Sequence, residues 1–241
     1  MKNSLNPDDF WFPGRWVGGI SLIVGPLLLL VGSVLRLPFD FFFTNQLIAF
    51  KQHPMRIMTA YNLFLAGNIL LYPAIITLAT LIGRTKPGWA IWGGNFVLLG
   101  LFARTFHYGI NHLAFQLVEV QSLGQATEAV ANSYGAFHIV ATLSAAILSG
   151  WTILAIGAYL SKAIGLIRAI ALASMSALMI GVLKGSSIVS VLVILGLCVA
   201  MVPLGVEVLR SGPKPGRLAI LKWSVLMFLL IGVMYFLGQA G

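Results

Sequence analysis

Residues 16–35 read WVGGISLIVGPLLLLVGSVL, a stretch that contains no charged side chain. A helix rises about 1.5 Å per residue, so about 20 mostly apolar residues are needed to cross the ~30 Å hydrocarbon core of a bilayer. Other stretches of the chain meet the same requirement. Together they predict seven membrane-spanning helices, over residues 16–35, 59–82, 89–111, 134–160, 164–183, 188–208 and 218–238.

The composition agrees with a membrane protein. The 241 residues are 59% hydrophobic and only 9% charged, whereas about a quarter of the residues in a soluble domain are charged. A β-barrel would show short alternating segments instead of continuous apolar runs. We therefore expect an all-α integral membrane protein, with residues 1–241 forming a single transmembrane domain. The expected location is the inner or plasma membrane, which the chain crosses several times.

Orientation follows from the short connections, because Lys and Arg gather on the cytoplasmic side. Three of them are rich in these residues: GRTKPG at 83–88, SKAIGLIR at 161–168 and RSGPKPGR at 210–217. This pattern predicts a cytoplasmic N-terminus and an external C-terminus. The two longest connections, 36–58 and 116–133, then lie outside. We expect the first to lie in the interface or cap the bundle, and the second to continue the preceding helix.

The charge and cysteine content exclude several classes of protein. The formal net charge is +9, but the basic residues separate apolar segments instead of forming one face, so nucleic-acid binding is not indicated. Cys198 is the only cysteine, which excludes disulfides within one chain. The N-terminal residues lack the order of a cleaved signal peptide. We therefore expect the first apolar stretch to remain in the mature protein.

One group of polar residues interrupts the predicted helix over residues 89–111. Helical spacing places its members on one stripe: Arg104, His107, Tyr108, Asn111 and His112. Arg104 lies roughly 22 Å from Trp89, in the outer half of the bilayer, where a buried arginine costs at least ~2.5 kcal/mol. No carboxylate is predicted at that depth. Asp40 or Glu119 could fold back over the site, or an anionic ligand could pair with the guanidinium.

Neighbouring predicted helices carry polar residues at a similar depth, namely Tyr61 and Asn68 on one and His138 on another. Their convergence with the stripe predicts an outer-facing pocket for a small amphiphilic or anionic molecule, in a transporter, receptor or immunity-like protein. The predicted ligand-binding residues are Arg104, His107, Tyr108, Asn111, His112, His138, Tyr61 and Asn68.

Other interpretations of the same residues stay open. His107 and His138 could be axial ligands of a haem, or one of them could serve an acid–base enzyme. A zinc site built by the protein alone is disfavoured, because His107 and His112 point apart on a helix. The stripe could also bind a helix of a partner membrane protein in a scaffold subunit. Finally, Arg104 could extend to the outer lipid phosphates, with no ligand involved.

Overall fold

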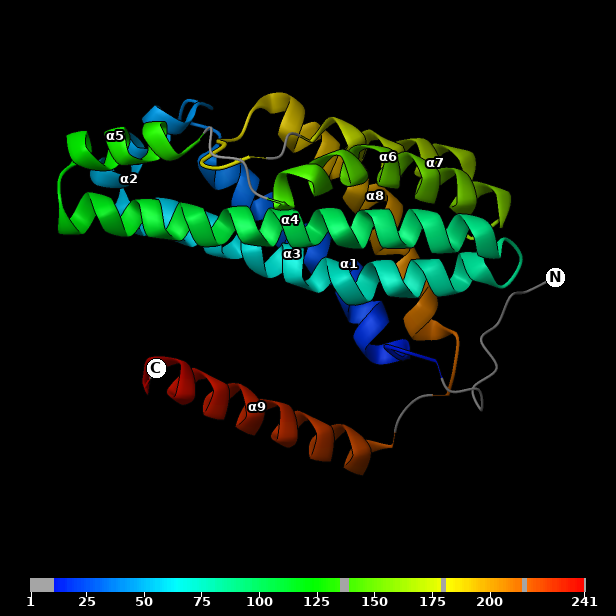
Figure 1. Ribbon diagram of the computed structural model, residues 1–241. Coiled ribbons are helices and arrows are strands. Elements are labelled where there is room, and N and C mark those ends of the chain that lie inside the picture. The colour runs from blue at the N-terminus through cyan, green and yellow to red at the C-terminus, as the bar shows by residue number, and fades with distance from the viewer. Residues whose placement is uncertain (1–10, 135–138, 179–180, 214–215, 241) are drawn as a thin grey trace. The chain divides into compact units, whose positions relative to one another are not determined.

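The computed structural model describes residues 11–134, 139–178, 181–213 and 216–240, and every regular element in these ranges is helical (Figure 1). The chain divides into two compact units. The larger is Phe10–Leu209, and the smaller contains the last helix. The elements in chain order are α1 (Arg15–Arg36), α2 (Phe43–Gln52), α3 (Pro54–Gly83), α4 (Pro87–Val120), α5 (Leu123–Tyr134), α6 (Val140–Leu160), α7 (Leu166–Ala173), the 3₁₀ turn η1 (Ser174–Ala177), α8 (Ile188–Arg210) and α9 (Arg217–Ala240).

Five helices are long and apolar enough to cross a membrane: α1, α3, α6, α8 and α9. The longest helix, α4, has 34 residues and measures about 51 Å. It is not among these five, and it carries the polar stripe. It continues to Val120, so residues 116–120 of the second predicted connection extend this helix. The rest of that connection does not continue it, because the helix ends there and residues from Leu123 onward form the separate helix α5. The other predicted connection, 36–58, contains α2 and the first turn of α3.

The predicted helix over residues 164–183 is interrupted. Its helical part ends with η1 at Ala177, and α8 begins only at Ile188. Leu183 has a left-handed backbone, with φ of 50°, a conformation that a helix does not accommodate. The sequence from Gly181 to Ser187 also contains two glycines and two serines, which favour turns over helix. We call the described residues 178 and 181–187 the linking segment.

Small residues allow the closest contacts between helices, as expected in lipid, where packing drives association. α1 packs on α3 at Gly32, where an added Cβ would lie 2.7 Å from the carbonyl oxygen of Ala60 and 2.9 Å from the amide nitrogen of Phe64. α4 packs on α6 in the same way, with Gly93 against Leu154 and Gly150 against Val97. These pairs hold α4 in a fixed position beside α6.

The path from α7 to α8 connects the two ends of the larger unit. At one end, Arg168 on α7 forms an ion pair of 3.0 Å with Glu207 near the end of α8. At the other end, the backbone N–H of Gly185 donates to the carbonyl of Phe41, which lies just before α2. The stretch from α7 through the linking segment therefore runs the length of the bundle. Figure 1 shows α7 beside α6 along this path.

Candidate functional site: a cationic cavity

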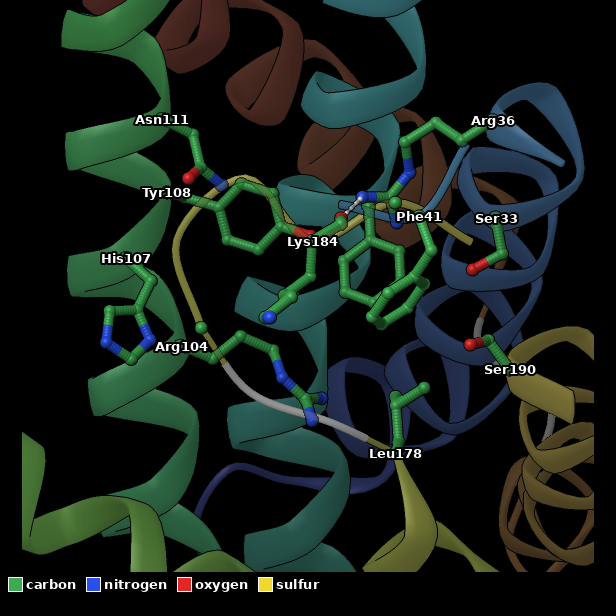
Figure 2. A pocket seen from close by; sticks show the side chains of 13 residues that line it. Ser33, Arg36, Phe41, Arg104, His107, Tyr108, Asn111, Leu178, Lys184 and Ser190 are labelled. Carbon is green, nitrogen blue, oxygen red and sulfur yellow. Dashed lines mark hydrogen bonds between the residues drawn. The ribbon is translucent and has the colours of Figure 1, made fainter. Parts of the chain in front are cut away.

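The linking segment closes a small cavity against α1 and α4 at the bundle end that carries α2. Its polar lining residues are Ser33 and Arg36 from α1, Arg104, His107, Tyr108 and Asn111 from α4, Lys184 from the linking segment, and Ser190 from α8. Its volume is ≈ 40 Å³, which is room for a few water molecules. Figure 2 shows these side chains around the space. We call it the cationic cavity.

Arg104 is the central residue of the cavity. It lies about 26 Å along α4 from Pro87, and only 4% of its surface is exposed. Figure 2 shows its guanidinium reaching into the cavity from α4. Within the described part of the chain, Nη1 and Nη2 have no hydrogen-bond acceptor. The guanidinium lies over the ring of Phe64, with its Cζ 6.0 Å from the ring centroid. A buried charge without hydrogen-bond partners is costly.

Arg36 brings a second guanidinium to the same cavity. It is 3% exposed, and its Nη1 donates a 3.0 Å hydrogen bond to the carbonyl of Lys184. Its guanidinium also lies over the rings of Tyr61 and Phe64, at 4.6 and 4.7 Å. Arg36 is the first residue of the predicted outer connection 36–58 and was not among the predicted ligand-binding residues. One signal could have indicated its burial. Arg36 lies four residues after Gly32, and residues at this spacing share one face of a helix, here the face of α1 that packs on α3.

The cavity has a strongly positive lining. Arg36, Arg104 and Lys184 contribute cations, and no carboxylate lies among the lining residues that the structure describes. Of the two alternatives left open by the sequence, the fold-back of an acidic residue does not occur in this structure: Asp40 and Glu119 are both exposed. The carboxylate of Asp40 instead accepts a hydrogen bond from Asn45, at 3.1 Å. The positive charge around the cavity is therefore not balanced by these residues.

Two of the residues predicted to bind a ligand also hold the linking segment. The side-chain oxygen of Asn111 accepts a 2.6 Å hydrogen bond from the backbone N–H of Leu183. The hydroxyl of Tyr61 lies 3.1 Å from Oε1 of Gln46 and 3.3 Å from the carbonyl of Lys184, and it can donate to either. Non-helical backbone is tolerated at membrane depth only where protein or water satisfies its polar groups. Asn111, Tyr61 and Arg36 bond the backbone of Leu183 and Lys184, which would satisfy that requirement if the segment lay within a membrane.

The remaining predicted residues occupy different places. His107 and Tyr108 line the cavity and are 7% and 8% exposed. Asn68 is fully buried elsewhere on α3 and donates to the carbonyl of Leu101 and the hydroxyl of Thr105, at 3.2 and 2.9 Å. It therefore ties α3 to α4.

His112 does not share the buried stripe. It is exposed, because eight residues of helix turn it about 80° away from Arg104. His138 lies outside the described residues, so its predicted place in the site, and a haem held between it and His107, remain predictions. Among the described residues, no cluster of three or more His, Cys, Asp or Glu side chains could hold a metal ion.

Comparisons of the chain with protein-family models, with curated proteins and with solved structures found no match. No relative therefore suggests a role for the cationic cavity. Its interpretation depends on the physical chemistry of its own residues. The features that decide it are the two buried guanidinium groups, the lack of a lining carboxylate among the described residues, and the small volume.

Proposed function

We propose that this protein binds a small anion, or the anionic head of an amphiphile, in the cationic cavity. The role would be that of a transporter, a receptor or an immunity-like binding protein. One observation carries the proposal: Nη1 and Nη2 of Arg104 are buried in a cavity and have no acceptor among the described residues.

The energetics favour an anionic occupant over water alone. Removing a charge from water costs several kcal/mol unless another charge and hydrogen bonds compensate. Arg36 makes the cost larger, because its charge repels that of Arg104. Water could satisfy the N–H groups, but it would leave the positive charge unbalanced. Guanidinium pairs with carboxylate or phosphate through short, charge-assisted hydrogen bonds.

We further propose that the chain crosses the inner or plasma membrane seven times, with the N-terminus in the cytoplasm. The crossings would be α1, α3, α4, α6, the stretch from α7 through the linking segment, α8 and α9. Support for the fifth comes from its contacts, with Glu207 near one end and Phe41 near the other. The basic connections then face the cytoplasm. The cationic cavity would lie in the outer half of the membrane.

The proposal can be tested by measuring how small anions bind the purified full-length protein. Phosphate, sulfate and acetate would be titrated by calorimetry in mild detergent. At least one should bind the wild type, and Arg104→Gln should weaken that binding about tenfold or more, equivalent to 1.4 kcal/mol. Arg84→Gln is the matched control, because Arg84 is exposed between α3 and α4. Equal losses in the two variants, or no binding at all, would contradict the proposal.

A further inference from the structure

We infer that the ligand of the cationic cavity is a phosphate group, held between Arg36 and Arg104. This inference rests on the proposed function and specifies its ligand. It concerns the chemistry shared by free inorganic phosphate and a lipid phosphate head group. The supporting observations are the hydrogen-bond donors around the cavity, their charge, and the volume that they enclose.

The cavity offers donors from two helices. Ser33 on α1 is 1% exposed, and its Oγ has no partner among the described residues. Nη1 and Nη2 of Arg104 on α4 are also buried and have no hydrogen-bond partner among the described residues. A phosphate group presents oxygens in several directions and can accept from both helices at once. A planar carboxylate has only two oxygens, which suit a single guanidinium fork.

Charge favours the same ligand. Arg36, Arg104 and Lys184 all line the cavity, so a monovalent anion would leave most of the positive charge unbalanced. A phosphate monoester carries about −1.5 to −2 charges at neutral pH. It therefore balances this lining better than a carboxylate or nitrate does.

Volume limits the occupant to the phosphate group itself. A cavity of ≈ 40 Å³ has no room for an acyl chain as well. A separate apolar groove of ≈ 260 Å³ lies between α4 and α5. Gly181 lines the cavity, while the next residue, Val182, lines the groove. A lipid could place its phosphate in the cavity and its acyl chain in the groove, whereas free phosphate would use only the cavity. The presence of an acyl chain on the probe therefore distinguishes a lipid phosphate from free phosphate.

The decisive experiment compares anions on the full-length protein in detergent by calorimetry. Inorganic phosphate should bind about tenfold or more tightly than acetate or nitrate. Arg104→Lys keeps the charge but loses the guanidinium fork, and it should reduce the preference for phosphate over acetate. Ser33→Ala breaks no described side-chain hydrogen bond, so it should fold normally and still weaken phosphate binding several-fold. Ser149→Ala, at an exposed site on α6, should leave binding unchanged.

The outcomes separate this inference from the proposed function. If acetate binds as tightly as phosphate and Arg104→Gln abolishes both, the phosphate inference is wrong and anion binding stands. If no anion binds in a manner that depends on Arg104, both are wrong.

A second comparison identifies the source of the phosphate. Dihexanoyl phosphatidate should bind more tightly than inorganic phosphate if the natural ligand is a lipid, and Ala129→Trp in the groove should remove that gain. Equal affinities that both depend on Arg104 would identify free phosphate. Either pattern supports the shared phosphate chemistry, while binding of neither probe would refute it.

Discussion

Asn111 and Arg104 lie about two helical turns apart on α4, both 4% exposed, yet their polar groups are satisfied differently. Asn111 accepts a hydrogen bond from Leu183, whereas the terminal nitrogens of Arg104 have no acceptor among the described residues. Helical periodicity in the sequence identified both positions. It could not separate their roles, because the partner of Asn111 comes from a segment expected to be helical. Arg36 was missed because its partners, the carbonyl of Lys184 and the rings of Tyr61 and Phe64, are distant in sequence.

Asn111→Ala should lower the stability of the protein. The N–H of Leu183 would lose its acceptor in a buried place, which costs about 1–3 kcal/mol. The measurement is thermal unfolding in detergent without added anion. His112→Ala is the matched control, because it alters the next residue at an exposed position and should change the midpoint little. Equal shifts in the two variants would show that the bond to Leu183 contributes nothing.

Among the elements, the helices around the site were the most predictable. Long apolar runs and their basic flanks gave the approximate positions of α1, α3, α8 and α9. The linking segment was not predictable, since residues 164–183 are apolar enough for a helix. The positive φ of Leu183 is compatible with the fold because Asn111 and Arg36 hold the backbone on either side. Those contacts are distant in sequence, so local pattern does not reveal them.

Gly32→Ala should destabilise the packing of α1 on α3. The new Cβ would meet the backbone of Ala60 and Phe64 at under 3 Å, and backbone cannot move aside as a side chain can. Overpacking of this kind costs about 1–3 kcal/mol. Gly109→Ala provides the control, because a Cβ there meets nothing within 4 Å and helix propensity favours alanine. A thermal midpoint for Gly32→Ala at or above that of the control would contradict the close approach of these helices.

Arg168→Ala should destabilise the protein more than Glu207→Gln. The ion pair between these residues is partly exposed, with 22% and 58% of the side chains accessible, and such pairs contribute about 0–1 kcal/mol. Arg168 also donates two hydrogen bonds to the carbonyl of Ala200, at 3.2 and 3.0 Å. Denaturation of both variants in detergent measures the difference. A larger loss for Glu207→Gln would show that the ion pair, and not the carbonyl contact, is the main interaction.

For the whole molecule, composition was sufficient to predict a helical membrane protein, and the structure has five helices that are long and apolar enough to cross a bilayer. The number of crossings depends on the stretch from α7 through the linking segment. Hydropathy treats this stretch as a helix, while its contacts show a broken element that extends between the two ends of the larger unit. The proposed seven-crossing arrangement therefore needs a test that is independent of helix length.

Cysteine labelling on intact cells provides that test. In a Cys198→Ala background, single cysteines would replace Gly88, Gly124 and Gly238, where an added Cβ meets nothing within 4 Å. A membrane-impermeant maleimide should label the cysteines at 124 and 238 but not the one at 88. Labelling at 124 without labelling at 238 would indicate an odd number of crossings between them. In that case the linking segment does not complete a crossing.

The most direct test of the central claim is an experimental density map of the protein in native-like lipid with phosphate present. The measurement is the density between Arg104, Arg36 and Ser33. We predict a compact feature of phosphate size within hydrogen-bond distance of Nη1 or Nη2 of Arg104 and of Oγ of Ser33. A guanidinium of Arg104 that points into the acyl chains, away from an empty or merely hydrated cavity, would contradict the claim.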